Sequence, residues 1–117
     1  MKATRREALK GALAVPAIAG LPTAAWARAG SAVLVHDPSL KMGRDLAAAL
    51  GSEAVAIDGD RIRFARSVFA RRPALVVGVT RAADALLIEE VAREAGYRPV
   101  AAPASLGKFG WALAPRA

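Results

Sequence analysis

The sequence predicts an α/β fold, a small three-layer sandwich in which a mainly parallel sheet of four or five strands carries helices on both faces. Two observations support this prediction. From residue 28 onwards, short apolar runs typical of buried strands alternate with segments whose apolar residues recur every three or four positions, as they do in helices. No linker divides residues 28–117, so we expect them to form one small α/β domain.

The first predicted strand comprises residues 31–35, an unbroken apolar run that ends at His36. A helix is expected to follow, because Asp37 is a favoured N-cap residue and Pro38 is favoured at the first helical position. Gly51 is expected to end this helix. Its apolar residues follow spacings of three and four and are Leu40, Gly43, Leu46, Ala47 and Leu50.

Residues 53–57 form the second predicted strand, and either Asp58 or Asp60 is expected to cap the helix that follows it. This helix must end before Pro73, because a proline ring disfavours a helical conformation in the preceding residue. Its apolar face is formed by Ile62, Ala65, Val68 and Phe69. Residues 74–79 are continuous, apolar and rich in β-branched side chains, so we expect them at the centre of the sheet.

A third helix is expected to begin at Thr80, whose spacing from Asp84 is close to that of a capping box. The predicted apolar face of this helix comprises Ala83, Leu86, Leu87, Val91 and Ala95. Residues 97–102 are predicted to form a strand near an edge of the sheet, since Pro99 has no amide hydrogen to donate to a neighbour. Residues 111–114 are expected to add a fifth strand.

Composition excludes several classes of site. The 117 residues include no cysteine and one histidine. A disulfide framework, a thiolate nucleophile, a cysteine-bound haem and a multi-histidine metal site are therefore excluded, and we expect no cofactor and no metal centre. The formal net charge is +7, but no aromatic or groove-fitting element accompanies the basic residues, so we expect no nucleic-acid partner.

The first 27 residues have the layout of a bacterial signal peptide, because a positively charged segment precedes residues 11–27, which carry no charge. The charged segment resembles a twin-arginine (Tat) translocation signal in Thr4, Arg5, Arg6, Leu9 and Lys10, with Ala8 in place of the usual phenylalanine. Ala25 and Ala27 match the small residues that signal peptidase recognises, with cleavage expected before Arg28.

The resemblance implies that the Tat translocase and signal peptidase act on this chain and that the domain works in the periplasm. Because Tat export carries folded chains, some of them bound to another protein, it also implies a possible periplasmic partner protein. The alternative is an uncleaved leader that tethers the domain to the membrane. A spanning helix needs about 20 apolar residues. Residues 11–27 fall short of this length and contain Pro16 and Pro22, so we expect no stable membrane span after cleavage.

Polar side chains follow the first three predicted strands, and these are His36 and Asp37, then Asp58 and Asp60, then Thr80 and Arg81. In open α/β sheets ligands bind beyond the carboxyl ends of the strands, so we predict that these residues bind a ligand. The three acids suit a hard cation such as Mg²⁺, and Thr80 with Arg81 suits an anion. The alternative is structural: the Asp and Thr residues cap helices, and His36 is held by hydrogen bonds.

Taken together, these features favour a small exported module that binds a partner protein or a small ligand without catalysis, because the alanine-rich core is thin and no nucleophile has recognisable partners. The alternative is a minimal enzyme, or a metal- or anion-binding domain, that uses residues at the strand ends; whether the chain is an enzyme stays open. One concave pocket shared by His36, Asp37, Asp58 and Thr80 would favour this alternative. An exposed apolar patch on a helix or sheet edge would favour binding.

Substitution of both Arg5→Lys and Arg6→Lys is expected to leave the protein in the cytoplasm, because the Tat resemblance rests on the two neighbouring guanidinium groups. Cell fractionation followed by immunoblotting measures the distribution. Unchanged export of this double variant would contradict the Tat assignment.

Overall fold

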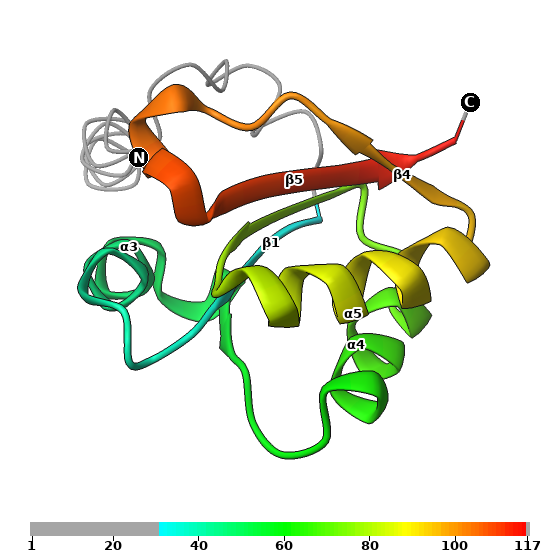
Figure 1. Ribbon diagram of the computed structural model, residues 1–117, viewed down its shortest axis with the longest axis horizontal. Helices are drawn as coiled ribbons and strands as arrows, with labels where there is room; N and C mark the ends of the chain where they lie inside the picture. The colour runs from blue at the N-terminus through cyan, green and yellow to red at the C-terminus, as the bar shows by residue number, and fades with distance from the viewer. Residues whose placement is uncertain (1–30, 117) are drawn as a thin grey trace, which may run out of the picture.

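The computed structural model describes residues 31–116, and the predicted leader and cleavage site lie outside them (Figure 1). The described elements, in chain order, are β1 (Ala32–His36), α3 (Lys41–Leu50), η2 (Gly51–Glu53), β2 (Ala54–Ala56), α4 (Arg61–Ala70), β3 (Leu75–Val79), α5 (Ala82–Glu94), β4 (Tyr97–Val100), η3 (Ala104–Phe109) and β5 (Gly110–Pro115). Within the described part of the chain, no helix is both long enough and apolar enough to cross a membrane.

The five strands form one sheet in the order β2-β1-β3-β5-β4. β1 is parallel to β2 and to β3, whereas β5 is antiparallel to both β3 and β4. The sheet is therefore mixed, which corrects the expectation of a mainly parallel sheet. The reason is that no crossover helix joins β4 to β5, so the chain turns back through η3 and β5 inserts between β3 and β4.

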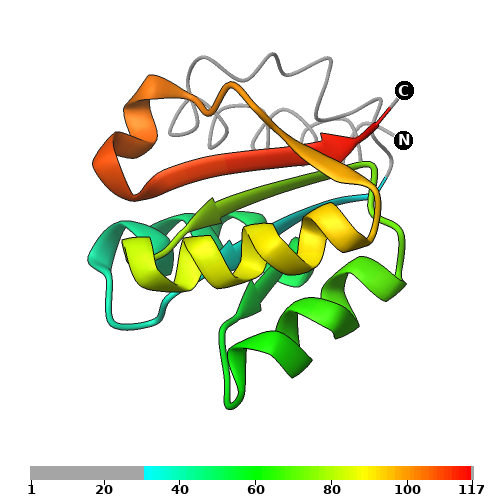
Figure 2. The same cartoon turned by 45° about the vertical axis from the view of Figure 1, so that its right-hand side comes forward.

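Helices cover both faces of this sheet, and each face has its own apolar cluster. On one face, α4 and α5 pack on Val33, Val35 and Val76; on the other, α3 and η3 pack on Leu34 and Val77. Side chains of successive strand residues point to opposite faces, which explains why neighbours in sequence belong to different clusters. Figure 2 shows α5 crossing in front of the sheet. The fold is thus an α/β sandwich of three layers.

Several local predictions are confirmed. β3 is the middle strand and β4 lies at an edge with Pro99 in it. Asp60 is the N-cap of α4, where its side chain accepts a hydrogen bond from the amide of Arg63. The predicted fifth strand is present as β5, and the second strand is shorter than expected.

Two predicted helix starts are wrong. α3 begins at Lys41, with Leu40 as N-cap, because the Asp37 carboxylate accepts a hydrogen bond from the Ser39 amide and the chain makes a turn before the helix. α5 begins after Arg81, and no side chain caps it. The hydroxyl of Thr80 instead donates to the carbonyl oxygen of Arg81 and accepts a hydrogen bond from the indole of Trp111.

The predicted apolar face of α5 is also incorrect in part. The buried residues of α5 are Ile88, Val91 and Ala92, whereas Leu86 and Leu87 are 65% and 42% exposed. Both sets follow helical spacing, and the position of the sheet decides which of them is buried.

Tyr97 connects the edge strand β4 to the rest of the α4–α5 face. It is 1% exposed, and its hydroxyl donates to the carbonyl oxygen of Pro73 over 2.6 Å. Its ring centroid lies 4.8 Å from that of Phe69, and the Arg72 guanidinium lies 5.0 Å from the ring centroid. One side chain therefore fixes β4 against α4 and against the loop before β3.

We expect Tyr97→Phe to lower the free energy of unfolding by about 1–2 kcal/mol, because it removes the hydrogen bond and leaves the Pro73 carbonyl without that donor. Urea denaturation of both proteins measures the change, and the slope against urea should be the same in both. An unchanged midpoint would show that the hydroxyl contributes nothing to stability.

Candidate functional site

The carboxyl ends of β1 and β3 lie side by side, where the topology of the parallel strands reverses. β2 and β3 pair with opposite edges of β1, and the connecting helices α3 and α4 pack on opposite faces of the sheet. His36 pairs with Val79 in the register of these strands, so the segment after β1 meets the segment after β3. This is the position where ligands bind in many open α/β sheets.

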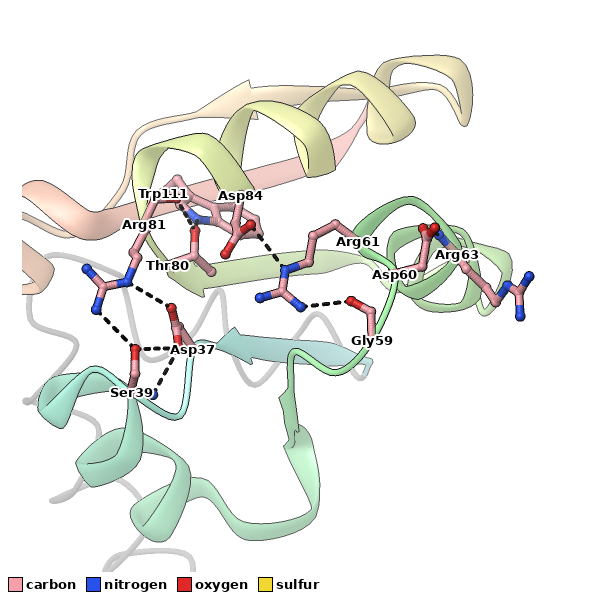
Figure 3. A network of polar contacts seen from close by, with 10 residues as sticks. All are labelled: Asp37, Ser39, Gly59, Asp60, Arg61, Arg63, Thr80, Arg81, Asp84 and Trp111. Carbon is pink, nitrogen blue, oxygen red and sulfur yellow. Dashed lines mark hydrogen bonds and ion pairs between the residues drawn. The ribbon is translucent and has the colours of Figure 1, made fainter.

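Asp37, Ser39 and Arg81 form a polar network at this position, which we call the Asp37 network (Figure 3). One carboxylate oxygen of Asp37 accepts from the amide of Ser39 over 2.9 Å and from its hydroxyl over 2.8 Å. The other lies 3.5 Å from Nε of Arg81, whose Nη2 donates to the Ser39 hydroxyl over 3.2 Å. The Ser39 amide, followed by the Ser39 hydroxyl and the charge of Arg81, holds the pKa of Asp37 below its usual value.

Thr80 is 1% exposed, and its hydroxyl interacts on two sides. It accepts a hydrogen bond from the indole nitrogen of Trp111 over 2.8 Å and donates to the carbonyl oxygen of Arg81 over 3.1 Å. The single hydroxyl hydrogen is thus committed to the backbone. Thr80 therefore joins β3 to β5 and to the start of α5.

His36 is 8% exposed and lies under α3. A methyl group placed on Gly43 would be 3.0 Å from Cβ of His36 and 3.6 Å from its Nδ1, so the helix backbone packs closely on the imidazole. Nδ1 is buried without a hydrogen-bond partner among the described residues. Burial lowers the pKa of His36, and the charge of Asp37 opposes this only in part. Burial therefore favours the neutral form of the imidazole.

Asp58 and Asp60 do not join the Asp37 network. Both are exposed in the loop between β2 and α4, and Asp60 is occupied as the cap of α4. The amide of Arg63 is the main cause that lowers the pKa of Asp60. Over residues 31–116 no three acidic or histidine side chains gather closely enough to hold a metal ion.

Arg61 provides a second polar link that sequence reasoning missed. Its Nε lies 3.1 Å from a carboxylate oxygen of Asp84, and its Nη1 donates to the carbonyl of Gly59 over 2.8 Å (Figure 3). Asp84, predicted as part of a capping box, therefore pairs with a residue of α4 instead. This contact fastens the start of α4 to the start of α5.

A groove of about 460 Å³ lies beside the Asp37 network, between the first half of α5 and the strands β5 and β4. We call it the α5 groove. Most of its lining is apolar, and the residues that form it are Thr80, Ala82, Ala85, Leu86, Glu89, Pro99, Val100, Ala102, Lys108, Phe109, Gly110, Trp111, Ala112 and Leu113. Of the candidate residues named from the sequence, Thr80 alone lines it. Its volume falls within the range of about 300–1,000 Å³ that is usual for small-molecule sites.

Trp111 in the α5 groove is held by Gly78 of β3 and by Thr80, which directly follows that strand. It is paired directly with Gly78 across the strands, and a methyl group on Gly78 would lie 2.0 Å from two carbons of the indole ring. Only a residue without a side chain permits this approach. The hydrogen bond to Thr80 then fixes the rotation of the ring. In the sequence, the sign of this close contact is Gly78, a single glycine within the apolar run of residues 74–79.

Comparison with known proteins found no matching family model, no matching curated protein and no matching solved structure. The side chains of the Asp37 network and of the α5 groove are therefore the basis for assigning a function.

Asp37→Asn is expected to lower the free energy of unfolding by about 1–2 kcal/mol at pH 7, because it weakens hydrogen bonds and an ion pair at a nearly buried carboxylate. The folded-state pKa of Asp37 is lowered, so its stabilisation is complete above the unfolded value of about 3.9 and is lost as the pH falls through the folded value. The difference from the wild type should therefore shrink below about pH 4.

Urea denaturation between pH 7 and pH 3 measures this difference. Asp45→Asn is the matched control, because Asp45 forms an exposed ion pair with Lys41 and its loss should change stability little. A difference between wild type and Asp37→Asn that persists unchanged at pH 3 would contradict the assigned role of the carboxylate charge.

Proposed function

We propose that this chain is an exported, non-catalytic binding module that holds a small apolar ligand in the α5 groove. The observation that carries the proposal is Leu86, which is 65% exposed at the wall of a hollow that also contains the half-buried indole of Trp111. Full burial of a leucine side chain is worth about 1.5–3 kcal/mol. A ligand that covers Leu86 therefore gains part of this energy.

The polar groups at the strand ends support binding in the groove rather than chemistry at the Asp37 network. Asp37, Ser39 and Arg81 bond to one another, and the Thr80 hydroxyl hydrogen is donated to the backbone. Nδ1 of His36 is sealed beneath α3. A minimal enzyme would need His36, Asp37, Asp58 and Thr80 in one pocket, and of these four only Thr80 lines the α5 groove.

Export by the Tat pathway to the periplasm is part of the proposal. Its support is the paired Arg5 and Arg6 with Leu9 and Lys10, followed by an uncharged segment and by Ala25 and Ala27 at the expected cleavage site. The domain then meets its ligand in the cell envelope.

A partner protein is the second candidate for the same surface, and Leu87 is the observation that favours it. Leu87 is 42% exposed next to Leu86 but does not line the α5 groove. A partner protein on α5 would cover both leucines, whereas a small ligand in the groove covers Leu86. Parallel substitutions at the two positions therefore separate the candidates.

The test uses the full chain with Trp26→Phe, in which Trp111 is the remaining tryptophan and reports on the groove. Addition of 4-phenyl-1-butanol, a neutral apolar probe, is expected to change the Trp111 emission in a saturable manner. Leu86→Ser should weaken this binding about threefold or more, since a partly exposed leucine loses part of its contact with the probe. Leu87→Ser, the matched control, should leave it unchanged.

Equal weakening by both substitutions would favour the broader surface that a partner protein needs. Absence of any saturable change in the Trp111 emission would overturn the proposed function.

A further inference from the structure

The lining of the α5 groove includes a preorganised aromatic surface. The indole of Trp111 is fixed by contact with Gly78, and its only hydrogen-bond donor is used by Thr80. The ring therefore offers a ligand its apolar surface and no free polar atom. A flat aromatic or alkyl group matches this surface, because its burial removes apolar area from water on both sides.

Two charged side chains line the groove, and they lie at different places along it. Lys108 is in η3, directly before Phe109. The carbonyl oxygen of Phe109 accepts a hydrogen bond from the amide of Thr80, so this part of η3 lies near the start of α5. Glu89 lies about two helical turns after Ala82, the first residue of α5, which corresponds to roughly 10 Å along the helix axis. The groove is therefore polarised, with its positive group at the end near Thr80.

The charge of Lys108 is available to a ligand. Lys108 is exposed, and no acidic side chain among residues 31–116 forms an ion pair with it. Its Nζ lies 5.2 Å from the ring centroid of Phe109, which is itself part of the groove wall. The ammonium group thus stands beside the apolar lining.

We propose that the α5 groove selects a small aryl- or alkyl-carboxylate, with the apolar body on Trp111 and the carboxylate beside Lys108. This inference rests on the proposed function and adds the charge of the ligand to it. Glu89 repels a carboxylate from the opposite end of the groove, so the two charged residues together set the direction in which the ligand lies.

The experiment compares 4-phenylbutyrate with its neutral counterpart 4-phenyl-1-butanol, using the Trp111 emission of the full chain with Trp26→Phe at low ionic strength. The carboxylate is expected to bind more tightly by up to about fivefold, the upper limit that one exposed ion pair provides. Lys108→Gln should remove this preference and leave the affinity for the alcohol unchanged. Lys41→Gln, in which an exposed lysine of α3 paired with Asp45 is lost, should retain the preference.

Salt and Glu89 provide two further readouts. The preference for the carboxylate should decrease at 0.5 M salt, because salt screens the attraction between the carboxylate and the exposed ammonium group of Lys108. The screening length falls from about 10 Å at 0.1 M salt to about 3 Å at 1 M. Glu89→Gln should leave the affinity for 4-phenylbutyrate unchanged or raise it up to about twofold, as loss of a like charge implies.

The outcomes separate the two proposals. Equal binding of the acid and the alcohol, or a preference that survives Lys108→Gln, would overturn the selection of carboxylates and leave apolar binding in the groove intact. Failure of both compounds to bind would overturn both proposals.

Discussion

Contact between Trp111 and Gly78 is the constraint on which the rest of the molecule depends. It joins β5 to the middle strand of the sheet in a fixed register, and a side chain at Gly78 would occupy the position of the indole ring. Because β4 pairs with β5, the edge of the sheet is positioned through the same contact. The indole that closes the sheet also forms part of the α5 groove, so the packing of the fold and the proposed binding surface share one residue.

The Asp37 network and the α5 groove are formed by different residues of this fold. At the carboxyl ends of β1 and β3, where open α/β sheets commonly bind ligands, the Asp37 network neutralises its own charges and holds two loops together. Arg61 and Asp84 tie α4 to α5 in the same manner. The polar groups thus stabilise the arrangement of the elements, whereas the exposed apolar area lies one strand away, beside β5.

Local patterns in the sequence predict most of the elements, the central place of β3, the edge position of β4 and the cap at Asp60. They fail where distant partners decide the outcome. The insertion of β5 between β3 and β4 depends on pairing between segments far apart in the chain, which no local period encodes. Leu86 and Ile88 both fit helical spacing, and the sheet alone determines which is buried. The candidate residues from the strand ends include Thr80 of the groove. Trp111 lies in a predicted strand and Lys108 in the loop before it, and no local pattern marked either of them as part of a site.

The position of β5 has a consequence for synthesis of the chain. β4 pairs with β5 and with no other strand of the described domain, and one edge of β3 is likewise satisfied by β5. While the ribosome has released β4 but not yet β5, the apolar strand β3 presents an unpaired edge and β4 has no place in the sheet. Such edges favour association between nascent chains. A chaperone that shields this edge until the last strand emerges would therefore protect the protein during the interval when it is most vulnerable.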